Sequence, residues 1–102
     1  MNPEKFTKSV QASLLKAQSL AVSRNHTALT PVHVLQAMLD EKETGTTFIF
    51  LNMGVDMALL NEKIKDYLID LPHLTEPTGG LVPTRELVEW FNLAERKAQT
   101  LD

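Results

Sequence analysis

The 102-residue sequence contains no cysteine, so disulfide bonds and thiolate metal sites are excluded. It also has no apolar run near the roughly 20 residues that a membrane-spanning helix needs. The first ten residues, MNPEKFTKSV, lack the apolar core of a signal peptide. Together these absences predict a soluble cytoplasmic protein.

An excess of basic residues is missing as well. The chain has 10 Lys and Arg against 13 Asp and Glu, for a net charge of −3, and the basic residues are scattered. Binding to nucleic acid or to an anionic membrane requires a basic patch, so neither partner is expected. The phosphate loop G-x-x-x-x-G-K-[ST] is also absent, so no ATP binding or hydrolysis is expected.

The hydrophobic fraction of 43% is sufficient for the core of one small domain. Apolar residues recur every three or four positions, which predicts helices. The expected helices cover residues 3–23, 31–42, a short stretch around 48–51, 57–71, and a last segment from Thr84 onward. The apolar run of the third segment also fits a strand, but its neighbours are helical and no partner strand is evident. The sequence therefore predicts an all-α domain of about five helices.

The ends of these helices carry recognisable signals. Capping residues are expected at the N-termini and prolines or glycines where helices stop. The expected N-caps are Asn2, Thr30, Asp56 and Thr84, Pro3 and Pro31 occupy first-turn positions, and Gly45, Gly54 and Pro72 end or separate helices. Residues 72–83, PHLTEPTGGLVP, form the one expected loop.

An internal repeat relates the first and last helices. Aligning Thr7 with Thr84 pairs Val10 with Leu87, Leu14 with Phe91, Ala17 with Ala94 and Ala21 with Ala98. Small residues at the last two positions allow two helices to approach closely. On this alignment Asp102 corresponds to Asn25, so a second copy is expected to be present only through its first helix.

The segment AQSLAVSRNHTALTPVHVLQAML resembles the Clp N-terminal repeat, whose pattern is A-x-x-x-A, a polar turn, then T/E-P-x-H-L-L-x-A-L-L. The matching residues are Ala17, Ala21, Thr30, Pro31, His33, Val34, Leu35, Ala37, Met38 and Leu39. The later motifs resemble the ClpB branch: Leu71-Pro72, Thr78-Gly79-Gly80, Pro83-Thr84, Leu87-Val88 and Asn92-Leu93. The resemblance covers essentially the whole chain.

The resemblance implies a domain of two pseudo-symmetric four-helix repeats, attached to the AAA+ ATPase modules of a hexameric, stress-related protein disaggregase. Residues 1–71 would be the first repeat, 72–83 a linker, and 84–102 the first helix of the second. The implied function is docking of unfolded or aggregated client proteins, or of adaptor proteins, with no enzymatic activity and no cofactor. The alternative is a stand-alone helical adaptor or regulator without an attached ATPase.

The resemblance also implies a client-binding site. In the family, a leucine at the position of Leu93 lines a hydrophobic groove, and a threonine at the position of Thr7 is functionally important. A second groove leucine falls at Lys97, a departure that puts that end of the groove in doubt. Trp90 lies beside Leu93 and joins the expected site. Core burial of Leu93, and a buried hydroxyl at a helix end for Thr7, remain open alternatives.

Other polar residues indicate no chemistry. His26, His33 and His73 lack metal-ligand spacing, and His33 is expected to form local hydrogen bonds and to pack. The carboxylates of Asp40, Glu41 and Glu43 are expected to lie in a solvated turn, because acid–base catalysis needs a pocket that separates their pKa values. Thr78-Gly79-Gly80 is expected to be a flexible connection rather than a phosphate cradle, since the next helix begins four residues later.

The last helix has apolar residues on more than one face. Leu87, Phe91, Ala94 and Ala98 share one face, whereas Val88, Trp90 and Leu93 lie elsewhere. An exposed apolar patch normally finds a partner. The chain is therefore expected to self-associate through this helix.

Overall fold

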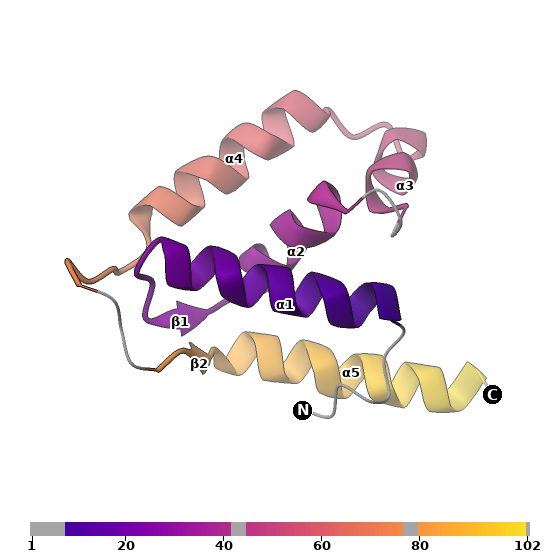
Figure 1. The fold of residues 1–102 in the computed structure, drawn as a ribbon. Helices are drawn as coiled ribbons and strands as arrows, with labels where there is room; N and C mark the ends of the chain where they lie inside the picture. Colours follow the sequence, from indigo (N-terminus) through magenta and orange to yellow (C-terminus); the bar gives the residue numbers. More distant parts are fainter. Residues whose placement is uncertain (1–7, 42–44, 77–79, 102) are drawn as a thin grey trace.

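The computed structural model describes residues 8–41, 45–76 and 80–101. The elements in chain order are α1 (Lys8–Ser23), β1 (Ala28–Leu29), α2 (Pro31–Asp40), α3 (Thr46–Asn52), α4 (Met57–Asp70), β2 (Val82–Pro83) and α5 (Arg85–Leu101) (Figure 1). The expected mostly helical fold with five helices is confirmed. Within the described residues, no helix is long and apolar enough to cross a membrane.

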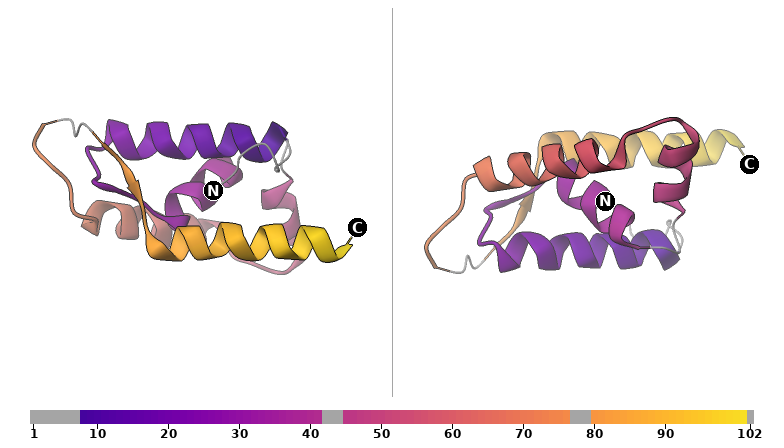
Figure 2. Two further views of the ribbon diagram at one scale, coloured as in Figure 1. Left: turned by 90° about the horizontal axis from the view of Figure 1, so that it is seen from below. Right: turned by 90° about the horizontal axis from the view of Figure 1, so that it is seen from above.

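Helix α2 is the centre of the domain, because it contacts each of the other four helices. Helices α1 and α5 run in opposite directions on either side of it (Figures 1 and 2). The core cluster combines α1, β1, α2 and α5, and its buried members are Leu14, Ala17, Ala21, Leu29, Val34, Ala37, Leu87 and Phe91. Burial of this apolar surface is the main force that holds α5 to the first four helices.

The predicted caps are confirmed where the structure describes them. The Thr30 side chain accepts a hydrogen bond from the His33 amide, Asp56 accepts one from Leu59, and Thr84 accepts one from Leu87. Each bond satisfies an amide that the first helical turn leaves unpaired. Gly45 and Gly54 have φ of 68° and 83°, the left-handed region that favours glycine.

Two short strands were not predicted from the sequence. Strands β1 and β2 pair in parallel, with Ala28 opposite Val82 and Leu29 opposite Pro83. Each strand is two residues long, so no alternating pattern is detectable in the sequence. The pairing fixes part of the predicted linker against the first half of the chain and brings the N-termini of α2 and α5 together.

Several predictions differ in detail or lie outside the described residues. Helix α2 ends at Asp40, two residues earlier than expected. The predicted start of the first helix near Asn2 and Pro3, and most of the Thr78-Gly79-Gly80 connection, are outside the described residues. Ala17 and Ala21 are fully buried as the close-approach pattern requires, whereas Ala94, the repeat partner of Ala17, is exposed.

Candidate functional site

Helix α5 presents an outward face that contains the predicted binding residues. Trp90 is 55% exposed and Leu93 is 48% exposed. Lys97 is exposed as well, and the spacing of three and seven residues places all three on one side of the helix. The inward positions Leu87 and Phe91 are buried in the core, which fixes the rotation of α5 and directs Trp90 outward.

A pocket of about 430 Å³ lies at the Trp90 end of this face. Three elements contribute its walls: the start of α2, the second half of α4 and the start of α5. The lining residues are Thr30, Pro31, Val32, Tyr67, Thr84, Glu86 and Trp90. The β1–β2 pairing places the capping residues Thr30 and Thr84 at the start of neighbouring helices, and so forms this pocket.

The lining of the pocket is suited to binding rather than to chemistry. It consists of two aromatic rings, two capping threonines, aliphatic groups and the carboxylate of Glu86. Tyr67 and Trp90 each offer a large apolar surface with one polar hydrogen-bonding group, as is common at sites that recognise polypeptides. An apolar or aromatic side chain fits this combination.

The predicted site residues have different outcomes. Trp90, Leu93 and Lys97 lie on one exposed face, and the exposure of Leu93 removes the core-burial alternative. Thr7 is outside the described residues. The sequence analysis did not predict Tyr67 or the Thr30–Val32 wall as parts of the site. The sequence contains one Tyr and one Trp. Because large amphipathic aromatic residues are this scarce, Tyr67 could have been singled out as a candidate for the site together with Trp90.

The structure brings His26 and His33 together, a contact that the sequence analysis did not predict. The Nδ1 atom of His26 and the Nε2 atom of His33 are 2.8 Å apart in a buried contact. His73 lies near them through a backbone bridge to His26. In the part of the chain that the structure describes, no three His, Cys, Asp or Glu side chains are grouped to hold a metal ion.

The protonation of this histidine pair follows from its partners. The backbone amide of Thr30 donates to Nδ1 of His33 at 3.0 Å, so the proton of neutral His33 lies on Nε2 and is donated to His26. Burial, together with the nearby His26 and Arg24, lowers the pKa of His33 to about 4. Burial also lowers the pKa of His26, opposed by a hydrogen bond to the backbone of Leu68. Both imidazoles are therefore neutral and have a structural role. The predicted local hydrogen bonding of His33 is confirmed.

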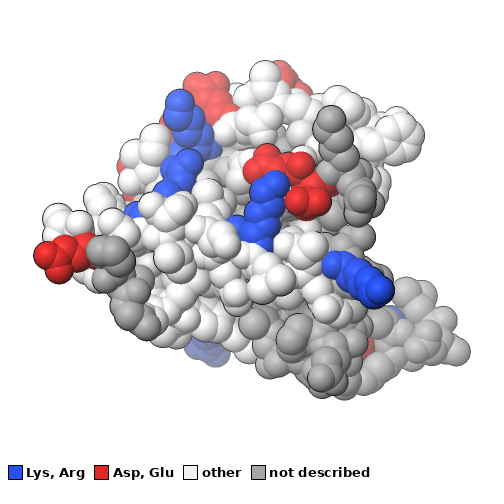
Figure 3. Space-filling model, in the orientation of Figure 1, with Lys and Arg blue, Asp and Glu red and all other residues white. Residues whose placement is uncertain are grey.

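The carboxylates at the C-terminal end of α2 lie near the surface. Asp40 is exposed, and the Oε1 atom of Glu41 lies 3.4 Å from the Nζ atom of Lys16 on α1. Figure 3 shows acidic and basic side chains scattered over this face of the molecule. Glu43 is outside the described residues. Asp40 is solvated as predicted, although it is the last residue of α2 rather than part of a turn.

Comparison with known proteins identifies relatives of the whole chain. Residues 5–102 match the family described as Clp repeat (R) N-terminal domain. The chaperone protein ClpB of Pseudomonas putida is 33% identical over 99 residues, which cover 97% of this chain and 12% of that protein. ClpB of Dichelobacter nodosus is 31% identical over 94% of this chain and 11% of its own length. ClpB of Vibrio cholerae is 31% identical over 97% of this chain and 12% of its own length. The chain thus spans about one eighth of these relatives.

Proposed function

Because this chain belongs to the Clp N-terminal repeat family, we propose that it is the client-docking module of a ClpB-type protein disaggregase. It binds exposed hydrophobic segments of unfolded or aggregated proteins, and adaptor proteins at the same surface. The observation that carries this proposal is the exposed Trp90–Leu93 face of α5 beside the Tyr67–Trp90 pocket. The module has no catalytic activity of its own.

The wider organisation is proposed from the same family membership. Residues 1–71 form the first repeat, 72–83 the connection, and 84–102 the first helix of a second repeat. The parent protein is a cytoplasmic, hexameric, stress-related ATPase that threads the docked clients. The domain engages a client with a few side chains, so its affinity is weak, on the order of micromolar or poorer.

Serine substitutions on the α5 face are expected to weaken client binding. Trp90→Ser and Leu93→Ser each remove an apolar contact and should raise the dissociation constant for a reduced, alkylated, permanently unfolded protein about fivefold or more. Fluorescence anisotropy of the labelled client measures this change. In the unsubstituted protein, the single tryptophan should shift its emission to the blue on binding, since its indole becomes buried.

Leu15→Ser is the matched control for these variants. Leu15 is 66% exposed on α1, outside the proposed site, so its replacement should leave client affinity unchanged. Equal affinity of all three variants and the unsubstituted protein would contradict the proposed site. If no unfolded protein shows saturable binding to the domain below about 1 mM, the proposed function itself is contradicted.

Self-association through α5 is expected to compete with client binding. Trp90, Leu93 and Ala94 are exposed on this helix, and a helix from a second copy could cover them. Phe91 is buried, so the patch is smaller than the sequence predicted. Sedimentation equilibrium should show a concentration-dependent dimer that Leu93→Glu disrupts. A strict monomer at millimolar concentration would contradict self-association and leave client docking intact.

A further inference from the structure

Helix α3 exposes its apolar side chains and buries a polar one. Thr46 is the buried residue of this helix, whereas Phe48, Ile49, Leu51 and the following Met53 are between 54% and 70% exposed. Residues 45–55 contain no charged side chain. Scattered exposed apolar residues are ordinary, but these four large ones lie within residues 48–53, and two of them, Phe48 and Leu51, line one pocket, which indicates an interaction surface.

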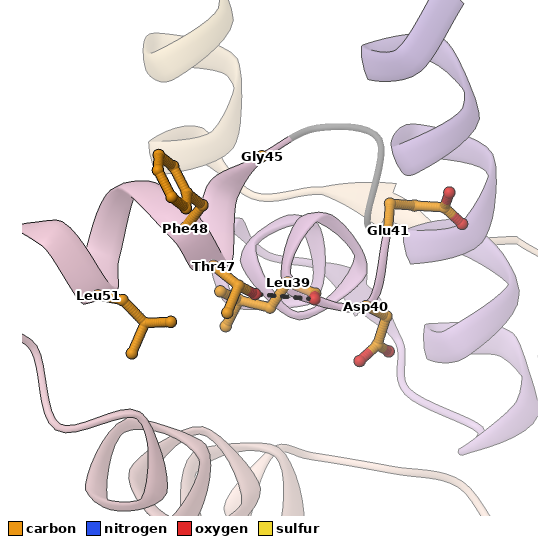
Figure 4. Close-up of a pocket in the computed structure, with 7 residues that line it drawn as sticks. All are labelled: Leu39, Asp40, Glu41, Gly45, Thr47, Phe48 and Leu51. Carbon is orange, nitrogen blue, oxygen red and sulfur yellow. Dashed lines mark hydrogen bonds between the residues drawn. The ribbon is translucent and has the colours of Figure 1, made fainter.

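A pocket of about 510 Å³ lies where this surface meets the end of α2. Its lining comprises Leu39, Asp40, Glu41, Gly45, Thr47, Phe48 and Leu51. In Figure 4, Asp40 extends from the α2 end of the pocket, Glu41 points toward α1, where it pairs with Lys16, and Phe48 and Leu51 extend from α3. The Thr47 hydroxyl donates a 3.2 Å hydrogen bond to the Leu39 carbonyl, which fixes α3 against α2.

This pocket is separate from the one beside Trp90. The Trp90 pocket uses the first residues of α2, Thr30 to Val32, and the α3 pocket uses the last, Leu39 and Asp40. The nearest lining residues on α2, Val32 and Leu39, are seven positions apart, so at 1.5 Å per residue the two pockets are about 10 Å apart or more. A ligand at one therefore leaves the other accessible.

Acidic residues flank the apolar surface on both sides in sequence. Residues 40–56 contain Asp40, Glu41, Glu43 and Asp56 against one Lys, so this segment carries a net charge of −3, equal to that of the whole chain. Figure 3 shows acidic side chains beside the mostly uncharged surface over α3, at the upper right. Asp40 is exposed and accepts one 2.9 Å hydrogen bond from Gln36. A carboxylate can accept several hydrogen bonds, so Asp40 can also accept one from a ligand.

We propose that the α3 pocket is a second docking site, for a polypeptide segment in which a large apolar residue is followed by lysine or arginine. The apolar side chain packs on Phe48 and Leu51, and the cation pairs with Asp40. A second copy of this chain is a poorer occupant, because a two-fold contact through α3 would bring the same acidic flanks together. Anionic membranes and nucleic acids are repelled by the same carboxylates.

The test uses two labelled synthetic peptides and backbone amide NMR of the full 102-residue chain. One peptide carries Phe and Leu each followed by Lys, and the other has Glu in place of each Lys. We expect the basic peptide to cause saturable shifts in residues 39–41 and 46–51, with weakening as salt is raised. Phe48→Ser should weaken binding about fivefold or more, and Asp40→Asn about twofold with a shallower salt dependence.

Matched variants make the result decisive. Phe48 and Asp40 are exposed, so both variants should fold, and Leu15→Ser tests whether any exposed apolar residue matters. Trp90→Ser should leave these shifts unchanged, which separates this site from the proposed client face. Equal binding of the acidic peptide, shifts confined to α5, or no saturation by about 1 mM would overturn the proposal. So would a dimer that Phe48→Ser converts to a monomer, because a second copy would then be the occupant.

Discussion

Lowering the pH from about 7.5 to about 4.5 is expected to reduce the free energy of unfolding by about 2–3 kcal/mol through His33 alone. The folded chain holds this imidazole neutral, with its pKa lowered to about 4 from 6.5 mainly by burial. The buried His26 contributes in the same direction. A small domain is stabilised by only about 5–15 kcal/mol, so this loss is a large fraction of the total.

The direction of the effect follows from proton binding. The unfolded chain protonates His33 below pH 6.5, whereas the folded chain does so only near pH 4. The stabilisation is therefore complete above pH 6.5 and decreases as the pH falls toward 4. A charged His33 would place a second proton on Nδ1, which faces the amide hydrogen of Thr30, and would leave a charge in the core.

Urea denaturation at a series of pH values measures this dependence. The region between pH 7 and 5 is the informative one, because most carboxylates titrate below it. Leu15→Ser, at an exposed position on α1, is the control and should preserve the slope. If His33→Gln fails to fold, NMR titration of the His33 ring protons in the unsubstituted chain gives the same answer. A free energy of unfolding that is constant from pH 7 to 5 would contradict the assignment.

The helix ends were predictable because their signals are local. The side chains of Thr30, Asp56 and Thr84 each accept a hydrogen bond from a nearby amide, and Pro31 follows Thr30 in the first helical turn. Gly54 adopts a positive φ that suits few other residues. Each of these features involves residues within three or four positions. The pairing of β1 with β2 joins residues more than fifty positions apart. Strands of two residues leave no pattern by which to predict that contact.

The site was partly predictable for the same reason. Helical spacing is enough to place Trp90, Leu93 and Lys97 on one face of α5, and family resemblance directed attention to Leu93 and Lys97. The Tyr67 wall of the pocket depends on how α4 packs, which no local pattern gives. The His26–His33 contact depends on a turn at Asn25, a non-glycine residue with φ of 58°, and on the start of α2.

Leu87→Ala is expected to destabilise the domain by about 2–5 kcal/mol. Leu87 has no exposed surface and belongs to the core cluster with Leu14, Val34 and Phe91. Its truncation removes apolar contacts and leaves a cavity that the surrounding helices fill only in part. The expected result is a lower urea midpoint with an unchanged dependence on urea concentration.

Loss of Leu87 should also weaken client binding, although this side chain does not reach the surface. Helix α5 is held by its contacts with α2, by the β1–β2 pairing and by the burial of Leu87 and Phe91. Removing one of these two anchors loosens the helix that carries Trp90 and Leu93. Leu93→Ala is the matched control on the same helix. Because Leu93 is half-exposed, its truncation should reduce the free energy of unfolding by about 1 kcal/mol or less, yet it should still weaken client binding. Equal stability losses in the two variants would show that Leu87 does not anchor α5 in the core.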